Sequence, residues 1–384
     1  MRQLSGKCYT FCFLLLMLLW QGSLAAANIT LKVRLFTGKS LTQISISPVK
    51  GSYSLKSGGK TLTALPLKSS CMLSLENGKI KVTKGEKTFG SATTMTIEPA
   101  NGSAILRLKV GSDDRSYEGA FSLKIVNGEI QLINRIELEK YVAGVVESEG
   151  GDARNTEFYK LQCLITRTYA MKNIRKHEAE GFQFCDQVHC QHYKNRGRYM
   201  EILAARDATR GKVIVDSAGR LINAAFHANS GGETVSSESV WSYKETYLKA
   251  MTDTFSLSMT KTLWEKSYKT TDFLNILQEK YAYPSSNPAM RDSALQFTQK
   301  NRKYFFPGGI SLKTLRSDLE LRSTFFSIEE KGDSVLIHGK GFGHGVGLSQ
   351  EGALRMARLG YTCDQILDYY YRNVSIKSLT NNMK

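Results

Sequence analysis

Residues 138–149 of this 384-residue chain read LEKYVAGVVESE, and this stretch decides how its surroundings are interpreted. Its apolar side chains recur at spacings of three and four residues, which predicts a helix with one buried face formed by Leu138, Tyr141, Val142, Val145 and Val146. Gly150 and Gly151 follow and are expected to end the helix. A second helix is predicted over residues 157–175, where Phe158, Leu161, Ile165 and Tyr169 form the apolar stripe.

Glu149 lies on the apolar stripe of the first helix, four residues after Val145, and at the helix C-terminus. Burial and the negative end of the helix dipole both disfavour a charged carboxylate, so both are expected to raise the pKa of Glu149. A carboxyl group that keeps its proton near neutral pH is what a general acid for glycosidic cleavage requires. The alternative is a frayed helix end with Glu149 in water.

Upstream of residue 138 the sequence has the pattern of β-structure. Short alternating runs separated by Gly or Asn-Gly turns occupy residues 33–36, 43–47, 79–83 and 105–110. The clearest hairpin signal places runs 122–126 and 129–133 on either side of Asn127-Gly128.

Downstream, helical and strand patterns alternate, and the chain is therefore predicted to be α+β. A hairpin is expected over 213–216 and 221–226, helices over 272–281 and 289–304, and a strand over 334–338. Thr362 and Gln365 have the spacing of a capping box that begins the last helix.

The first 27 residues have the order of a secretory signal: the positive charges of Arg2 and Lys7, an apolar run over 11–20, and small residues before residue 28. We therefore expect export to the periplasm or the extracellular cell wall. The whole chain has a formal charge of +17, and removal of Arg2 and Lys7 leaves 17 − 2 = +15. This charge favours acidic partners such as wall polymers, and the scattered Lys and Arg do not form a block typical of nucleic-acid binding, so no nucleic-acid partner is expected.

Cys185, His189 and Cys190, with His177 nearby, offer thiolate and imidazole ligands at close spacing, and His192 is an alternative fourth ligand. Two thiolates and two imidazoles suit tetrahedral zinc. A Cys185–Cys190 disulfide, favoured in an oxidising compartment, and free thiols are the other interpretations.

Two further groups of residues are candidates for ligand binding. Lys160 and Arg167 are seven residues apart and share one face of the second helix, where they can bind an acidic sugar or form a solvated face. Residues 339–347 read GKGFGHGVG, with glycine at every second position, which allows close approach of a ligand or of another chain segment. His344 in this repeat, and His227 and Ser230 in the run FHANSGG, are candidate contacts.

Taken in order, these motifs resemble the SpoIID/LytB family. The resemblance begins with the helix that ends in Glu149 and continues through Glu157, Lys160, Gln162 and the RTYA run at 167–170. It also includes the Cys/His stretch at 185–193, the SGGET loop at 230–234, Val240-Trp241, Tyr247-Leu248 and, most specifically, GFGHGVGLSQ at 341–350 followed by Gly352-Ala353. Gly150-Gly151 stands where the family often has Met-Pro after the glutamate.

The resemblance implies a SpoIID/LytB-like domain over residues 110–384, after a β-rich N-terminal region of unknown role at 28–109. It implies a lytic transglycosylase with a helix-lined cleft that cleaves MurNAc–GlcNAc bonds of peptide-stripped peptidoglycan strands to 1,6-anhydroMurNAc ends. Glu149 would be the acid and base, while Lys160, Arg167, His227, Ser230 and His344 would bind substrate. Zinc at the Cys/His cluster would be structural, and the chemistry itself would need no cofactor.

Other functions remain open at this point. A non-catalytic wall-binding protein that enhances an N-acetylmuramoyl-L-alanine amidase is the first, as in the LytB branch of the family. A zinc-dependent hydrolase that uses the Cys/His loop and a basic nucleic-acid binder are the others.

Overall fold

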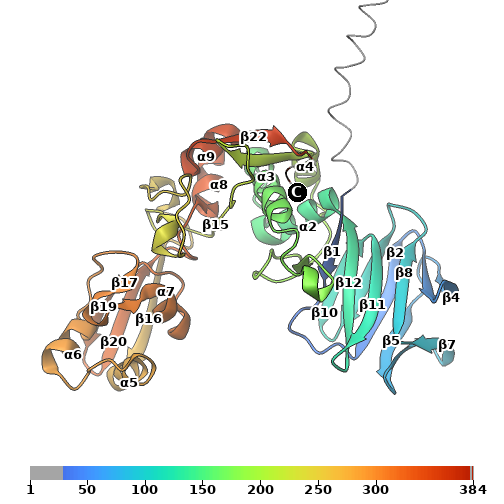
Figure 1. Ribbon diagram of the computed structural model, residues 1–384, viewed down its shortest axis with the longest axis horizontal. Coiled ribbons are helices and arrows are strands. Elements are labelled where there is room, and N and C mark those ends of the chain that lie inside the picture. The colour runs from blue at the N-terminus through green and yellow to red at the C-terminus, as the bar shows by residue number, and fades with distance from the viewer. Residues whose placement is uncertain (1–28, 381–382, 384) are drawn as a thin grey trace, which may run out of the picture. The chain divides into compact units, whose positions relative to one another are not determined.

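The computed structural model describes residues 29–380 and 383, and it divides into two compact units (Figure 1). The described part of unit 1 contains residues 29–151, 166–213, 376–380 and 383, and unit 2 contains residues 152–165 and 214–375. The predicted signal, residues 1–27, lies outside the described residues. Within the described part of the chain, every helix is too short or too polar to cross a membrane.

Unit 1 contains two large sheets. The seven-stranded sheet has the order β13-β1-β12-β11-β8-β3-β4, with bounds Phe184–Cys185, Thr30–Arg34, Glu129–Glu137, Ala120–Val126, Thr94–Pro99, Tyr53–Ser57 and Lys60–Leu65. The six-stranded sheet has the order β10-β9-β2-β5-β6-β7, with bounds Asp113–Glu118, Ile105–Val110, Gln43–Lys50, Cys71–Glu76, Lys79–Lys84 and Lys87–Ala92. Both sheets bury alternate side chains, such as Ile44 and Ile46 of β2, as the period-two pattern predicts.

The predicted hairpin about Asn127-Gly128 is confirmed, because β11 and β12 pair from Ala120↔Arg135 to Val126↔Glu129. Strand β12 buries five consecutive residues, 130–134, and leads directly into helix α2 (Leu138–Gly150). Helix α2 contacts both β12 and β1. Unit 1 also contains the C-terminal part of α3 (Thr156–Lys172), the short helix η1 (Glu178–Glu180) and α4 (Met200–Ala208).

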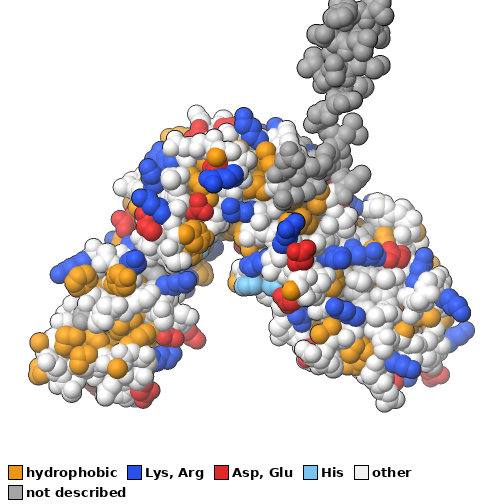
Figure 2. Space-filling view, viewed as in Figure 1, with side chains coloured by type: hydrophobic (Ala, Val, Ile, Leu, Met, Phe, Trp, Pro, Cys, Tyr) orange, Lys and Arg blue, Asp and Glu red, His pale blue; other side chains and the backbone are white. Residues whose placement is uncertain are grey.

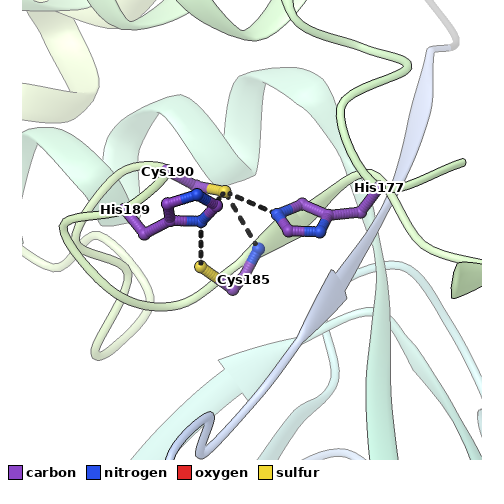
Figure 3. Close-up of side chains that lie close together, drawn as sticks. All are labelled: His177, Cys185, His189 and Cys190. Atoms are coloured by element: carbon purple, nitrogen blue, oxygen red, sulfur yellow. Dashed lines mark hydrogen bonds between the residues drawn. The ribbon is translucent and has the colours of Figure 1, made fainter.

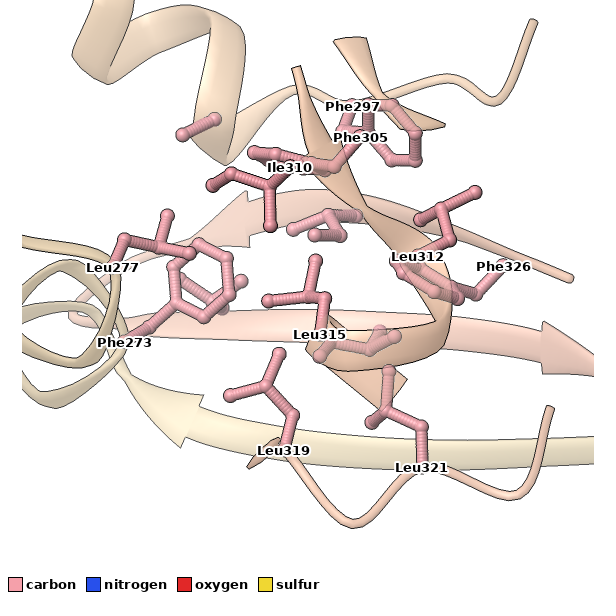
Figure 4. Close-up of a cluster of buried hydrophobic side chains, with 14 of the residues drawn as sticks. Phe273, Leu277, Phe297, Phe305, Ile310, Leu312, Leu315, Leu319, Leu321 and Phe326 are labelled. Atoms are coloured by element: carbon pink, nitrogen blue, oxygen red, sulfur yellow. The ribbon is translucent and has the colours of Figure 1, made fainter. Parts of the chain in front are cut away.

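Unit 2 contains a three-stranded antiparallel sheet, β16-β20-β19, with bounds Leu263–Lys269, Ser334–Lys340 and Phe326–Lys331. Helices α5 (Thr270–Tyr281), α6 (Pro288–Leu295) and α7 (Leu312–Asp318) and strands β17 (Tyr304–Phe305) and β18 (Ile310–Ser311) accompany it. Their apolar side chains form one buried cluster, in which Phe273 and Leu277 of α5 and Leu315 of α7 lie near Phe297 and Phe326 (Figure 4).

The rest of unit 2 is built around short strands and two C-terminal helices. Strands β15 (Phe226–His227) and β21 (Leu348–Ser349) pair in parallel, and α8 (Gln350–Arg358) and α9 (Cys363–Tyr370) follow. Short 3-10 helices span Ser237–Ser239, Thr254–Ser256 and Phe306–Gly308. The chain changes unit after Gly151, within α3, and within the strands β14 (Lys212–Asp216) and β22 (Val374–Ser378). The predicted capping box is present, with Thr362 accepting from the Gln365 N–H and Gln365 accepting from the Thr362 N–H.

Mixed helices and strands confirm the α+β class, but one local prediction was wrong in length and another was confirmed only in part. The helix expected over 289–304 ends at Leu295, because Phe297 leaves the helix to form a β-bridge with Ile328 and packs on Phe305 with ring centroids 4.6 Å apart. The hairpin expected over 213–216 and 221–226 forms only around its turn. The bridge Val215↔Leu221 and the bonds from Asp216 N–H to the Arg220 carbonyl and from Ile222 N–H to the Ile214 carbonyl mark its extent. Phe226 pairs instead with Leu348, more than 100 residues away in the sequence, so local turn signals could not reveal its partner.

Candidate functional site

Glu149 occupies the last turn of α2 and is half-buried. Its Oε1 accepts a hydrogen bond of 2.8 Å from the backbone N–H of His192. Burial raises the pKa of Glu149, and the His192 N–H opposes this with a smaller lowering effect. The carboxyl is therefore partly shielded from water, and its burial favours the protonated form, as its place on the apolar stripe predicted.

The residues beside Glu149 are fixed by the same segment of chain. The backbone N–H of Lys194 donates to Ser148 Oγ at 3.1 Å. Arg198 donates from Nε to Glu147 Oε1 at 2.7 Å, and the backbone N–H groups of Arg198 and Tyr199 donate to Glu147 Oε2. The segment 192–199 thus clamps the C-terminal turn of α2 through three consecutive side chains.

Small residues allow this clamp to lie close to the helix. A Cβ atom added at Gly144 would lie 2.5 Å from the carbonyl oxygen of Asn195, and one at Gly197 would lie 2.6 Å from the Cβ of Ala143. Any larger side chain at either position would push the segment 192–199 away from α2. Glycine is therefore required here for the polar contacts of the clamp to form.

The clamp is continuous with the Cys/His cluster of His177, Cys185, His189 and Cys190 (Figure 3). Their ligand atoms all lie within 4.8 Å of one another, with His177 Nε2 at 3.3 Å from Cys190 Sγ and His189 Nδ1 at 3.8 Å from each sulfur. The four predicted ligands are therefore brought together, with His177 in the fourth position. His192, the alternative fourth ligand, is instead part of the clamp, where its N–H is bonded to Glu149.

The chemistry of this donor set fits zinc. Two sulfurs and two imidazole nitrogens are the ligands of structural zinc sites, and their spacing is close to the edges of a tetrahedron with bonds of about 2.0–2.3 Å. Cys185 and Cys190 are both buried free thiols, not a disulfide. The hydrogen bond between the two thiols lowers the pKa of Cys185 and raises the pKa of Cys190, so Cys185 is the thiol that more readily supplies the thiolate that a metal requires.

Asp186, next to Cys185, anchors the cluster to the N-terminal strands. Its fully buried carboxylate accepts from the backbone N–H of Phe36 at 2.8 Å and of Thr37 at 3.0 Å, and from Arg115 Nη1 at 2.8 Å. The Arg115 guanidinium also lies over the Phe36 ring at 4.4 Å. Sequence inspection missed this residue, because its partners lie 71 to 150 positions away.

Arg167 has a structural role that does not fit its predicted contact with substrate. Its side chain is fully buried, and its Nε and Nη2 bind both oxygens of Glu139 at 2.9 and 2.6 Å. Its Nη1 donates to the carbonyl oxygen of Lys212 at 2.9 Å. The guanidinium thus ties α3 to the first turn of α2, out of reach of a ligand.

Lys160 remains accessible. Its Nζ lies 2.6 Å from Glu157 Oε1, one turn earlier on α3, and 30% of its side chain is exposed. The ion pair raises the pKa of Lys160, so the ammonium stays charged at neutral pH. The other oxygen of Glu157 accepts from the backbone N–H of Cys363, which fixes this pair against the start of α9.

The glycine repeat of unit 2 lies against the segment 225–231. Gly341, Gly343, Gly345 and Gly347 all have positive φ, between 71° and 116°. A Cβ atom at Gly343 would lie 2.7 Å from the Cβ of His227, and one at Gly347 would clash with the carbonyl oxygen of Ala225. The repeat therefore permits a close approach of two chain segments, which is one of the two explanations that the sequence offered.

This approach brings His227 and His344 together. Their ring centroids lie 5.5 Å apart, and the ring of Trp241 lies 5.5 Å from that of His344. His227 is buried and donates from Nδ1 to the carbonyl oxygen of Val346, while its Nε2 has no hydrogen-bond partner among the described residues. Burial lowers the pKa of His344 to about 4 and that of His227 below its usual range, so both rings are neutral at pH 7.

Ser230 is engaged within the protein. Its buried hydroxyl donates to Asp253 Oδ2 at 2.7 Å and lies 2.7 Å from Ser256 Oγ. Asp253 is fully buried and also accepts from Tyr370 OH at 3.0 Å. Ser230 consequently shapes the loop that carries His227, and its predicted direct contact with substrate does not fit this burial.

The predicted residues therefore fall into two groups. Glu149, Arg167 and the Cys/His cluster belong to unit 1, whereas Lys160, His227, Ser230 and His344 belong to unit 2. Trp241 and its stacked neighbour Tyr243, with centroids 5.7 Å apart, were not predicted as site residues, although they follow the loop of Ser230 closely in the sequence.

Comparison with known proteins gives a consistent result. Residues 126–215 match the family model described as SpoIID, stage II sporulation protein. The chain is 28% identical to stage II sporulation protein D of Bacillus subtilis (strain 168) over 278 residues, which cover 66% of this chain and 78% of that one. The identity to the protein of the same name from Bacillus amyloliquefaciens is 28% over 329 residues, covering 80% and 93%. The amidase enhancer of Bacillus subtilis (strain 168) is 27% identical over 361 residues, covering 80% of this chain and 50% of that protein.

Proposed function

Because the chain belongs to the SpoIID/LytB family, we propose that it is a peptidoglycan lytic transglycosylase that uses Glu149 as its single acid and base. The substrate would be glycan strands without stem peptides, cut between MurNAc and GlcNAc. The observation that supports this proposal most is the half-buried Glu149 carboxyl, whose pKa burial raises. We further propose that the protein is exported and meets this polymer at the cell wall.

The two oxygens of Glu149 suit the two halves of the reaction. Oε1 is fixed by the His192 N–H, which leaves Oε2 to carry the proton. Glu149 donates this proton to the bridging oxygen as the C1–O bond of MurNAc breaks, and positive charge develops at C1. The same carboxylate then accepts the proton of the C6 hydroxyl as that oxygen bonds to C1, which forms the 1,6-anhydro ring and restores the acid.

One carboxyl is sufficient for this reaction, because the internal C6 hydroxyl replaces the water that an inverting or retaining hydrolase activates with a second carboxylate. Glu147, two residues earlier, is unsuitable as a second acid, because Arg198 and two backbone N–H groups bind its carboxylate. Among the predicted substrate contacts that lie in unit 2, Lys160 is accessible and His344 is half-buried, whereas His227 and Ser230 are buried and support the loop that carries them.

A zinc ion at the Cys/His cluster would be structural, since His177, Cys185, His189 and Cys190 would fill all four positions. Its effect on Glu149 would be indirect. The cluster fixes the start of the segment whose His192 N–H binds the Glu149 carboxyl, so the metal would hold the acid in place without taking part in the chemistry.

The test is incubation of the purified protein with amidase-treated glycan strands, followed by mass spectrometry of the products. We expect 1,6-anhydroMurNAc ends from the unaltered protein and a loss of about 1000-fold or more for Glu149→Gln, in line with removal of a general acid that also acts as base. Glu201→Gln, at an exposed position of α4 in the same unit, is the matched control and should keep the activity. Equal product from the Glu149→Gln protein would refute the assigned acid.

The 27% identity to an amidase enhancer supports a second candidate, in which the protein binds the wall and stimulates an N-acetylmuramoyl-L-alanine amidase. Gly150-Gly151 after the glutamate is the sequence feature that favours it. Tight binding to sacculi without anhydro products, together with faster release of stem peptides when a purified amidase is added, would support this function over the first.

A further inference from the structure

Cations and exposed aromatic side chains are interleaved in three segments of unit 2, at residues 300–306, 322–325 and 340–342. These segments read KNRKYFF, RSTF and KGF and contain no acidic residue. We refer to them together as the basic aromatic surface. In the space-filling view, hydrophobic and Lys or Arg side chains lie next to one another over the region of β17 and β19 (Figure 2).

In the first segment each exposed ring has a cation over it. Lys303 Nζ lies 5.3 Å from the centroid of the Tyr304 ring, and Lys300 Nζ lies 5.4 Å from that of Phe306. Tyr304 is 41% and Phe306 58% exposed, so neither ring is a core residue. Large exposed apolar groups of this kind are typical of binding surfaces.

Phe325 joins the three segments. The Arg302 guanidinium lies 4.2 Å from its ring centroid, and Lys340 Nζ lies 5.5 Å from it on another side. The backbone N–H of Lys340 also donates to the Phe325 carbonyl oxygen at 2.7 Å. In the third segment Phe342 is 39% exposed, and the Arg322 guanidinium lies 5.9 Å from its ring.

Arg302 is the buried cation of the basic aromatic surface. Only 8% of its side chain is exposed, and Glu233 binds its Nη1 at 3.3 Å. Its Nε is buried without a hydrogen-bond partner among the described residues. Its Nη2 packs on Gly345, where an added Cβ would lie 3.1 Å away, so the surface adjoins the glycine that follows His344.

The charge of the surface is not balanced by the protein. Among the described residues, Glu233 is the one acid in an ion pair with any of its five cations, namely Lys300, Arg302, Lys303, Arg322 and Lys340. Cation–π contacts at exposed sites contribute little, roughly 0.5–1 kcal/mol in general, and leave the ammonium groups open to an anion. A ligand that combines flat apolar faces with regularly spaced negative charges would satisfy both kinds of group.

We propose that the basic aromatic surface binds the carboxylate-bearing glycan strand of peptidoglycan outside the point of cleavage. This inference rests on the proposed function. The apolar faces of the sugar rings would stack on Tyr304, Phe306 and Phe342, and the lactyl carboxylates of MurNAc would pair with the exposed ammonium and guanidinium groups. Single-stranded nucleic acid is the competing ligand, because it is bound through the same combination of aromatic and basic groups.

The test is binding of fluorescently labelled, amidase-treated glycan strands to the purified protein in the Glu149→Gln background, so that the ligand is not consumed. Two double variants address the two kinds of contact: Tyr304→Ala with Phe306→Ala, and Lys300→Ala with Lys303→Ala. The matched control is Lys87→Ala with Phe89→Ala, another surface cation–π pair with a separation of 5.3 Å, located on β7 of unit 1.

We expect each double variant of the surface to weaken binding about tenfold, equivalent to about 1.4 kcal/mol, and the control to bind normally. A neutral chitin hexamer should bind more weakly than the glycan strand and should respond to the aromatic variant but not to the lysine variant. Unchanged binding in both surface variants, an equal loss in the control, or tighter binding of an oligodeoxythymidine would overturn the proposal. Product formation is measured separately on the Glu149-containing proteins, so a failure of the transglycosylase assignment is distinguishable from a failure of this surface.

Discussion

The end of α2 in unit 1 and the glycine repeat in unit 2 fix their candidate site residues in different ways. At the end of α2, side-chain carboxylates and a hydroxyl accept backbone N–H groups from the segment 192–199. In the glycine repeat, missing side chains allow two backbones to approach, which places His344 beside His227. Burial acts on both, raising the pKa of the Glu149 carboxyl and lowering the pKa of the imidazoles.

The difference shows that both regions favour the uncharged form of their site residues near neutral pH, but depend on different properties of the chain. The end of α2 depends on paired polar groups, so loss of one partner leaves a half-buried or buried group unsatisfied. Unit 2 depends on backbone conformation, so its weak points are its glycines. Four sets of variants test this contrast, in order of decreasing expected effect on stability.

The Cys/His cluster should dominate the stability of unit 1. The protein is expected to contain one zinc per chain, measurable by elemental analysis, and Cys190→Ser should remove it. Structural zinc couples on the order of 10 kcal/mol of binding to folding in small peptides, so the variant should show the largest fall in melting temperature of the four. Cys71→Ser, at a buried thiol far from the cluster in sequence, is the control and should retain the metal. A full zinc content in Cys190→Ser would mean that the cluster is not the metal site.

The Arg167–Glu139 pair should have the next largest effect. Arg167→Met keeps much of the side-chain volume but leaves the Glu139 carboxylate buried without its cation, which costs about 3–5 kcal/mol in comparable cases. Lys160→Met on the same helix removes a partly exposed ion pair, for which about 0–1 kcal/mol is expected. Urea unfolding of the two variants gives both values. If the losses are equal, burial does not distinguish these cations, and Arg167 regains its place as a candidate ligand contact.

Gly347 provides the corresponding test in unit 2. Gly347→Ala combines a positive φ of 71° with a clash against the Ala225 carbonyl oxygen, and we expect a loss of about 3 kcal/mol. Gly360→Ala is matched in conformation, with φ of 92°, but its Cβ would meet nothing within 4 Å, so only about 1 kcal/mol should be lost. Similar urea midpoints for the two variants would show that backbone strain alone, and not close approach, determines the stability of the repeat.

Substitution of Glu149 should change the free energy of unfolding least of the four. The sign of that change shows whether the charged carboxylate destabilises the folded protein. Burial raises the pKa of Glu149 in the folded protein, so between the unfolded pKa, about 4.3, and the folded pKa the native state holds more protons than the unfolded state. The carboxyl therefore costs no stability below this window and an increasing amount as pH rises through it. Glu149→Gln should unfold like the unaltered protein at pH 4 and be slightly more stable at pH 7, as measured in urea. A variant less stable at pH 7 would indicate a carboxylate stabilised by its surroundings, which is unsuitable for a general acid.

Local sequence patterns predicted much of the fold and part of the candidate site. The periodicity of residues 138–149 fixed the face of α2, and with it the burial of Glu149, because a helix repeats every 3.6 residues. Asn127-Gly128 predicted the β11–β12 hairpin, because the geometry of a two-residue turn depends on those residues alone. The Cys/His spacing likewise indicated four side chains whose potential ligand atoms lie together in the structure.

Contacts between distant residues were not predictable from one sequence. The spacing of Lys160 and Arg167 showed a shared helix face, but not that Glu139, 28 positions earlier, buries and neutralises Arg167. The sequence predicted that Ser230 lies in a loop open to a ligand. In the structure its hydroxyl is bonded to Asp253 and Ser256, which lie more than 20 residues away. The basic aromatic surface joins segments that lie about 15 to 40 residues apart and meet only in the folded sheet.

The anchor at Asp186 has a consequence for how far this protein can be shortened. The matched family segment begins at residue 126, yet the carboxylate beside the Cys/His cluster is bonded to the backbone of Phe36 and Thr37 and to Arg115, and β13 pairs with β1. A fragment cut at residue 126 would leave the Asp186 carboxylate without these partners and expose the edge of β13 next to the Cys/His cluster. The smallest piece of unit 1 that can be transplanted or expressed alone therefore includes its N-terminal strands, which makes them part of the machinery around the acid and not a detachable appendage.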